Sequence, residues 1–442
     1  MRSLAEPAAA WGGAGYDDRW AALARAGLAH GLVDTRLHGR RYVSLNAVVL
    51  TDGEARALRR LTGQFGHLFD RAVEGLLADS DWWPLLAWPW PALELARQEP
   101  CHLGGLATLY GRFDWLLDER GRWQVIEYNA DTPSGGREAS GLEAAVYRLH
   151  DGRAAGLRRL SPGLAGAVAG SLATRVQQHR ASSPTGARPL IGVVSSHGWV
   201  EDMAQAWWLA GLLKAQGLNT LVGDVRDLAV RGGQVSLRGA AIDVLYRFYP
   251  IERLYRHGIF APLLEAALDG HLLLLNGLRG FLAQSKAVLA WLWEHRADTD
   301  LGFRARRLIE AHLPPTFPAA DARAGRLLPR AVVKHVNGRE GDSVAFGGAL
   351  SARDWERRLL EGGYVVQQRV SSQAVADVEV DEQAGTVAVV APRYPCVGTF
   401  CVGGRFGGCY TRLDGPITTA RATFVPTLAE RWPAARGPIT AE

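Results

Sequence analysis

The stretch Arg112-Phe113-Asp114, followed after a charged turn by Glu127-Tyr128-Asn129-Ala130-Asp131-Thr132-Pro133, carries the most structural information in this chain. Residues 115–126 are predicted to form the rest of two short strands and the glycine-containing turn between them. Because side chains on a strand alternate between faces, Arg112 and Asp114 share one face, and so do Glu127 and Asn129. A hairpin can therefore bring together one guanidinium group, two carboxylates and one amide oxygen.

These oxygen ligands suit Mg²⁺, which takes one or two carboxylates and completes its octahedron with water and substrate phosphates. The neighbouring arginine would add a bidentate clamp for phosphate. The alternative is a surface hairpin with ordinary polar faces. However, Val125 and Ile126 indicate a partly buried strand, where so many polar groups without a function would be costly. The sequence favours a site for metal and phosphate.

Only three of the 50 basic Lys and Arg residues are lysines: Lys214, Lys286 and Lys334. This bias predicts that the remaining lysines are enriched where a compact ammonium is required. Lys334 lies in a β-branched run at 331–336, and a small polar loop at 337–344 follows, which could offer N–H groups to phosphates. Lys286 lies near the start of a helix-like pattern, where a solvated helix residue is the alternative. Lys214 is predicted to lie at the surface.

Bulk properties limit the class of protein. A chain of 442 residues with 48% hydrophobic and 21% charged residues predicts two or three packed units with substantial cores. The net charge of +5 suits anionic small molecules, but no basic run resembles a nucleic-acid footprint. Neither a signal peptide nor a membrane span is evident, and the four cysteines lack zinc-type spacing. We expect a cytoplasmic protein with reduced thiols, no nucleic-acid partner and no membrane contact.

The order of predicted elements indicates a mixed α/β (α+β) fold. We expect a mainly helical N-terminal region (1–100), then a hairpin and helices (101–181), and a linker at 181–189. A strand–helix–strand unit with a parallel sheet follows at 188–270. Residues 271–442 form the last region, with helices first and then strands at 331–336, 364–370, 386–391 and 397–402.

Six ordered motifs cover most of residues 100–430: Arg112 to Asn129 with the Glu-Tyr-Asn-Ala-Asp run, Ile242-Asp243-Val244 with Tyr249-Pro250-Ile251-Glu252, Leu275-Asn276 with Ser285-Lys286, Lys334 with Gly338-Arg339-Glu340-Gly341, Tyr364-Val365-Val366-Gln367-Gln368, and Arg412 with Ile417-Thr418. Together they resemble the synthetase part of the glutathionylspermidine synthase family. The resemblance implies a circularly permuted ATP-grasp fold in which the parallel unit is pre-ATP-grasp-like. Residues 1–100 contribute little to it.

The resemblance also implies roles for the hairpin residues. Asp114, Glu127 and Asn129 would bind Mg²⁺, and Arg112 would contact the nucleotide phosphates or an acyl phosphate. Arg412 matches the arginine that stabilises the transferring phosphoryl group or the tetrahedral intermediate. Arg112 and Arg412 are therefore the predicted catalytic residues.

Further residues would bind ATP by the same resemblance. Lys286 and Lys334 would hold its phosphates. The loop formed by Gly338, Arg339, Glu340 and Gly341 would act as a mobile cover. Gln367 and Gln368 would lie at the hinge that receives adenine through main-chain hydrogen bonds. The permutation explains why the metal ligands precede the nucleotide lysines in the chain.

Two departures from the family pattern limit the substrate assignment. The amidase domain of the bifunctional members has no counterpart here. Thr419-Ala420-Arg421 follows Ile417-Thr418, where the family usually continues with Gly-Asn. We therefore expect an ATP-dependent ligase that joins a small carboxylate, amino-acid or peptide-like, to an amine through an acyl phosphate, without assuming glutathione or spermidine. Two alternatives stay open: transfer of the acyl group to a thiol or alcohol, and a non-catalytic nucleotide-binding homologue. A homodimeric state also stays open. A glycosidase is disfavoured, because it would leave the lysine and glycine segments without a function.

Lesser candidates follow two strand ends. Ser195, Ser196 and His197, with Glu201 and Asp202, could line the carboxylate pocket or cap the next helix, and capping is favoured. Arg247 and Glu252 could bind a charged substrate or form a structural ion pair.

Overall fold

The computed structural model describes residues 1–37, 39–102, 104–181, 188–339, 341 and 343–431, and it is a mixed α/β structure as expected. The predicted linker lies largely at 182–187, outside these residues. Among the described residues, no helix is long and apolar enough to cross a membrane.

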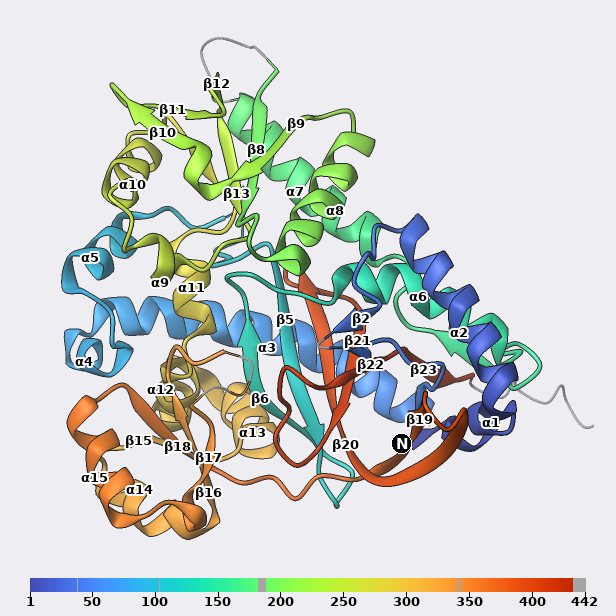
Figure 1. Cartoon of the computed structure of the whole chain (residues 1–442). Helices are drawn as coiled ribbons and strands as arrows, with labels where there is room; N and C mark the ends of the chain where they lie inside the picture. The colour runs from blue at the N-terminus through green and yellow to red at the C-terminus, as the bar shows by residue number, and fades with distance from the viewer. Residues whose placement is uncertain (38, 103, 182–187, 340, 342, 432–442) are drawn as a thin grey trace, which may run out of the picture.

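The central layer is a six-stranded sheet in which the hairpin at 110–129 lies beside strands from 375–425 (Figure 1). Its main strands run in the order β22-β21-β20-β5-β6, and β19 pairs with the first part of β20. The long helix α3 packs on this sheet. The bounds are β5 Tyr110–Leu117, β6 Trp123–Asn129, β19 Val375–Asp381, β20 Thr386–Val402, β21 Arg405–Asp414, β22 Thr423–Val425 and α3 Asp52–Ala78.

The predicted hairpin is confirmed. Strands β5 and β6 are antiparallel, with Arg112 opposite Asn129 and Asp114 opposite Glu127. A bulge follows, because Trp115 pairs with Val125 and leaves Ile126 as the additional residue. The four polar side chains therefore stand together on one face, while the alternate residues face the core.

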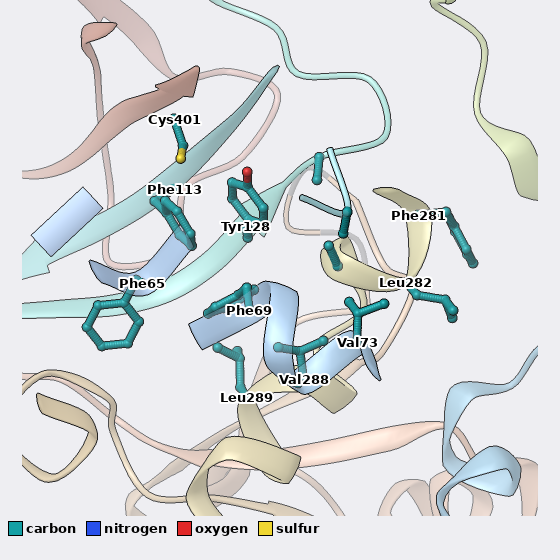
Figure 2. Close-up of a cluster of buried hydrophobic side chains, with 14 of the residues drawn as sticks. Phe65, Phe69, Val73, Phe113, Tyr128, Phe281, Leu282, Val288, Leu289 and Cys401 are labelled. Carbon is teal, nitrogen blue, oxygen red and sulfur yellow. The ribbon is translucent and has the colours of Figure 1, made fainter. Parts of the chain in front are cut away.

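The core behind this hairpin is aromatic and rests on α3 (Figure 2). The helix begins with a capping box between Thr51 and Glu54, and its apolar residues recur at helical spacing along the buried face. The Phe113 ring stacks on Tyr128 at 3.9 Å between centroids and meets the edge of Phe69 at 5.1 Å. This packing fixes the hairpin on the helix and so fixes the polar face on the opposite side.

A second, smaller antiparallel sheet carries the strands predicted around Lys334. Its order is β15-β18-β16-β17, and it has a small core of its own with two short helices. The strands predicted at 331–336 and 364–370 are confirmed to within two residues. The bounds are β15 Thr316–Pro318, β16 Ala331–His335, β17 Ala345–Phe346, β18 Tyr364–Gln368, α14 Ala322–Leu327 and α15 Ala352–Glu361.

The predicted strand–helix–strand unit forms a parallel sheet in the order β14-β13-β8-β9. Helix α8 packs on β8 and β9, and α7 packs on α8. The bounds are β8 Leu190–Ser195, β9 Asn219–Asp224, β13 Val244–Arg247, β14 Leu273–Leu274, α7 Leu164–Ala181 and α8 Val200–Ala215.

One strand differs from the sequence expectations. The strands predicted at 386–391 and 397–402 form one strand, β20, because its first part pairs with β19 and its second part lies between β5 and β21. The N-terminal region is mainly helical, and its short strand β4 pairs with the C-terminal strand β23 in a sheet ordered β1-β4-β23-β7. These bounds are β1 Arg2–Ser3, β4 Val48–Leu50, β7 Leu157–Arg159 and β23 Thr427–Glu430.

The remaining elements include a three-stranded sheet ordered β10-β11-β12 and a two-stranded sheet of β2 and β3. They are α1 Ala5–Ala9, α2 Gly12–Ala29, β2 Arg36–Leu37, β3 Arg40–Arg41, α4 Trp83–Leu86, α5 Trp90–Gln98, α6 Gly136–Leu149, β10 Leu228–Arg231, β11 Gln234–Leu237, β12 Ala240–Ala241, α9 Ile251–Leu254, α10 Phe260–Leu268, α11 Leu278–Gln284, α12 Ala287–Glu294 and α13 Gly302–His312.

Replacing Phe113 by Ala tests the packing of the hairpin on α3. The Phe113 side chain is fully buried, so Phe113→Ala removes its ring contacts and leaves a cavity. We expect the free energy of unfolding in urea to fall by about 3–5 kcal/mol. Phe303→Ala is the matched control, because that ring is 72% exposed and its loss should change stability by no more than about 0.5 kcal/mol. Equal effects of the two substitutions would contradict this account of the core.

Candidate functional site

A cavity of about 810 Å³ receives residues from the central sheet, the small sheet and the parallel unit. Eleven of the thirteen residues proposed from sequence line it: Arg112, Asp114, Glu127, Asn129, Lys286, Lys334, Arg339, Gly341, Gln367, Gln368 and Arg412. Gly338 does not line the cavity, although its carbonyl oxygen accepts a hydrogen bond from Lys286. Glu340 lies outside the described residues. We call this cavity the cleft.

The carboxylate of Asp114 is the centre of a buried charge cluster. Arg112 donates to it twice, from Nε to Oδ1 at 2.8 Å and from Nη2 to Oδ2 at 3.1 Å. Arg412 Nη2 and Asn129 Nδ2 also donate to Oδ2, at 2.8 Å and 3.1 Å. Burial opposes the ionisation of Asp114, but the two guanidinium groups hold the pKa of this carboxyl below its usual value. Asp114 therefore stays charged and holds both arginines at the wall of the cleft.

A second ion pair joins the hairpin to α12. Lys286 Nζ lies 3.0 Å from Glu127 Oε1 and donates to the carbonyl oxygen of Gly338 at 2.8 Å. Its side chain is almost completely buried, so the alternative of a solvated helix residue is wrong. In contrast, Lys214 is exposed, as expected.

Lys334 reaches the cleft from strand β16. Its Nζ donates to Gln367 Oε1 at 2.8 Å and to the Ile126 carbonyl oxygen at 3.2 Å. Burial, assisted by the nearby charge of Lys286 and opposed by Glu127, lowers the pKa of this lysine to about 8. A buried ammonium group with neutral oxygen partners is well suited to accept an anion.

The two glutamines at the end of β18 differ in their environments. The buried Gln367 side chain connects Lys334 to Thr316, donating from Nε2 to Thr316 Oγ1 at 3.0 Å. Gln368 is exposed, and its backbone N–H already donates to the carbonyl oxygen of Pro315 at 2.8 Å. That N–H is thus engaged within the protein rather than turned toward a ligand.

Apolar residues that the sequence analysis did not single out line the part of the cleft beside these glutamines. They come from β5, β6, the small sheet and the segment after β18, and they are Leu116, Ile126, Val332, Phe346 and Val370. The guanidinium of Arg369 lies 4.3 Å from the centre of the Phe346 ring. Such walls can enclose a planar ring. No single motif marks these residues, because they are ordinary apolar positions on separate strands.

Arg339 belongs to a network of ion pairs at the edge of the cleft. It contacts Glu252 and Asp131, with its closest approach to each at 2.6 Å. Asp131 also pairs with the buried Arg247 at 2.5 Å. Arg247 and Glu252 thus both take part in ion pairs, each with a different partner. Asp131 is completely buried and fixes the segment that follows the hairpin.

The other end of the cleft is polar and was not predicted. Glu138 Oε2 accepts a hydrogen bond from Gln205 Nε2 at 3.2 Å, and Oε1 accepts one from the Tyr42 hydroxyl at 3.3 Å. The hydroxyls of Tyr42 and Tyr410 lie 2.7 Å apart, and the Tyr410 ring lies 5.0 Å from the Arg112 guanidinium carbon. This group connects the arginine cluster to helices α6 and α8. We call it the polar pocket.

Some of the lesser candidates line the cleft in the structure and others do not. Glu201 and Asp202, in the first turn of α8, line the cleft. Ser195 is buried at the end of β8, and the backbone N–H of His197 donates to Asp224. Neither Ser195, Ser196 nor His197 lines the cleft.

The predicted metal ligands can be tested against Mg²⁺ chemistry. Within the described part of the chain, no group of three or more His, Cys, Asp or Glu residues is arranged to hold a metal ion. The predicted set has two carboxylates and an amide, which suits a Mg²⁺ ion that also keeps water and phosphate oxygens. In this structure Asp114 is bound by two arginines and Glu127 by Lys286. The donors fit the ion, and their role as ligands stays a prediction.

The fold is that of ATP-grasp-like synthetases. Residues 16–430 match the family described as glutathionylspermidine synthase preATP-grasp, and the chain belongs to this family. No curated protein matches the sequence significantly.

A solved structure has the same fold. A glutathione synthetase-like effector from Globodera pallida, in its apo form, superposes with a TM-score of 0.59 and 10% identity, covering 93% of this chain and 96% of that one. A putative gamma-glutamylcysteine synthetase from Methylobacillus flagellatus is less similar, with a TM-score of 0.41, 10% identity, and 83% and 86% of the two chains covered. Family membership supports, at a general level, an amide-forming ligase that uses ATP and small-molecule substrates.

The lowered pKa of Lys334 predicts a pH dependence of stability. The folded protein loses this proton near pH 8, whereas the unfolded chain keeps it to about 10.4, so the unfolded state binds more protons in between. The contribution of Lys334 to the free energy of unfolding should therefore rise with pH. Between about pH 7.5 and 9.5, wild type should gain about 1–2 kcal/mol relative to Lys334→Met in chemical denaturation. Lys214→Met, at an exposed position, should show no such change, and a constant difference for Lys334→Met would contradict the assignment.

Proposed function

We propose that the protein is an ATP-dependent carboxylate–amine ligase that forms an amide bond through an acyl phosphate and releases ADP and phosphate. The observation that carries the proposal is the convergence of Lys286, Lys334, Arg112 and Arg412 with Asp114 and Glu127 on one cleft. Phosphoryl transfer depends on positioning and charge neutralisation, and this arrangement supplies both.

The two lysines would bind the phosphates of ATP. Lys286 and Lys334 approach the cleft from different elements, the start of α12 and β16, and both are buried. Their present partners are Glu127, two carbonyl oxygens and the Gln367 amide oxygen. Phosphate oxygens could join or replace the neutral partners without leaving either ammonium group unpaired. The apolar walls at Ile126, Val332 and Phe346 would then enclose the adenine ring.

The arginine pair would stabilise the transferring group. Arg412 Nε is buried and has no hydrogen-bond partner in the described part of the chain, so one donor of this side chain is unused. Arg112 and Arg412 are both held by Asp114, which means that their orientation does not have to be created when substrate binds. Such preorganised donors suit the charge that develops on the phosphoryl group and on the tetrahedral centre.

Asp114, Glu127 and Asn129 would hold Mg²⁺, with Glu127 the more accessible of the two carboxylates at 20% side-chain exposure. When bound, the ion would neutralise phosphate charge and orient the phosphoryl group for attack by the carboxylate. Glu127 would have to release or share Lys286 to take this role.

The polar pocket would bind the substrates. Its acceptor, Glu138, and its donors, the Tyr42 and Tyr410 hydroxyls and the Gln205 amide, suit a molecule that carries both ammonium and carbonyl groups. It lies beside Arg112, where an acyl phosphate would form. These features support an amino-acid or peptide-like carboxylate and an amine as the substrate classes.

Two other outcomes remain as alternatives to ligation. Transfer of the acyl group to a thiol or alcohol would use the same phosphate site. Mass spectrometry of the products formed from a panel of acids, amines, thiols and alcohols distinguishes this transfer from amide ligation. A non-catalytic nucleotide-binding protein would be expected to lack a charge in the phosphate site. Every charged residue that the sequence analysis assigned to the nucleotide, the metal or catalysis, and that the structure describes, lines the cleft.

Replacing Arg412 by Ala tests the catalytic assignment. Asp114 keeps its pair with Arg112 in this variant, so the fold should persist. If Arg412 stabilises the transferring phosphoryl group, ADP release with a productive acid and amine should fall by about 10³–10⁵-fold. Arg405→Ala is the control on the same strand, because Arg405 is exposed and does not line the cleft. Turnover of Arg412→Ala equal to that of Arg405→Ala would remove Arg412 from the mechanism.

A further inference from the structure

A second cavity, separate from the cleft, has a volume of about 190 Å³. It lies among α5, α7, α10, α11 and strand β14, and it shares no residue with the lining of the cleft. In Figure 1, helices α5 and α11 lie below the parallel unit and α10 lies beside it. Its walls are mainly aliphatic and include Leu95, Leu264, Ala267, Leu274 and Leu278. We call it the side cavity.

An unpaired guanidinium group lines the side cavity. Arg175 projects from α7 and is half-buried, and no hydrogen bond or ion pair involves it in the described part of the chain. Burial lowers the pKa of Arg175, and no acidic neighbour among the described residues offsets this effect. The undescribed segment 182–187 contains no Asp or Glu. A half-buried guanidinium group without an ion pair is free to accept an anion as its partner.

Two histidines line the side cavity with Arg175. His102 is only 8% exposed, and its Nδ1 is buried without a hydrogen-bond partner among the described residues. Burial, and then the charge of Arg175, lower the pKa of His102 to about 4, so the ring is neutral near pH 7. His179 lies one helical turn after Arg175. Burial, and then the charge of Arg175, lower the pKa of His179 as well. A neutral imidazole can donate from Nδ1, which leaves two unused donors at this cavity, on Arg175 and His102.

The acidic groups at the side cavity are already engaged. Glu99 accepts a hydrogen bond from the backbone N–H of Arg279 at 2.8 Å, and its carboxylate supports the first turn of α11. The guanidinium of Arg279 pairs with Glu74. Asp243, which is near His179, accepts a hydrogen bond from the backbone N–H of Leu190 at 2.8 Å. None of these carboxylates forms an ion pair with Arg175, and the positive potential there is open to an external anion.

The size and the walls define the kind of anion. A cavity of about 150 Å³ with aliphatic walls can hold a benzene-sized molecule, so the side cavity admits a ligand of about that size. Inorganic phosphate would leave the leucine walls without contacts. We propose that the side cavity is a binding site for a small monocarboxylate with an apolar body, whose carboxylate lies at Arg175 and His102. The assignment does not depend on the proposed ligase activity.

Calorimetric titration of the full-length protein with sodium benzoate tests this site. We expect wild type to bind benzoate with a Kd on the order of 1 mM, because the ligand is small. Arg175→Gln should weaken binding about tenfold or more, since one charged hydrogen-bonding partner is lost. The Arg175→Gln variant breaks no pair within the described structure, so it should remain folded. Arg148→Gln, at an exposed position on α6, is the matched control and should bind like wild type.

Two further measurements distinguish the side cavity from the cleft. Ala267→Phe should reduce benzoate binding by filling the side cavity, while Arg412→Ala, in the cleft, should leave it unchanged. Benzyl alcohol, which has the same ring but no charge, should bind about tenfold more weakly than benzoate. The proposal is overturned if wild type does not bind benzoate, if Arg175→Gln binds it as well as wild type does, or if Arg412→Ala alone abolishes binding.

Discussion

The buried ion cluster around Asp114 is the interaction on which the site depends. One carboxylate orients Arg112 and Arg412, which belong to strands β5 and β21 and lie far apart in the chain. Two guanidinium groups beside each other would repel, and a fully buried carboxylate alone would be costly, so the cluster is stable only as a whole. The aromatic core between the hairpin and α3 supplies the rigid support, because Phe113 and Tyr128 fix the strand faces on which the charged residues stand.

Much of the site could be predicted from the sequence because its residues lie on strands with a simple two-residue alternation. The sharing of one face by Arg112 and Asp114, and by Glu127 and Asn129, followed directly from that alternation and is confirmed by the register. The scarcity of lysine drew attention to Lys286 and Lys334 as places that need a compact ammonium group, and both line the cleft. The mixed α/β fold and the family were also correct, because several ordered motifs constrain each other. The roles of these residues in catalysis and metal binding remain predictions.

The features that were missed depend on contacts between distant segments. Tyr42, Glu138 and Gln205 meet only because α6, α8 and the N-terminal region converge, and none of them lies in a motif. The apolar residues near Gln367 are ordinary core-like positions in the sequence. The single long strand β20 was predicted as two, since the pairing of its halves with different partners is not visible locally. Arg175 is likewise unremarkable among so many arginines until the structure shows that it has no acidic partner among the described residues.

The central claim is that the cleft between the hairpin and the small sheet binds nucleotide phosphates and a divalent ion. A crystal structure of the protein with adenylyl imidodiphosphate and Mn²⁺, with anomalous data collected for the metal, tests it most directly. The account predicts triphosphate density between Lys286 and Lys334, and an anomalous peak beside Asp114 and Glu127. Nucleotide density in another part of the molecule, or a metal peak away from the hairpin, would contradict it.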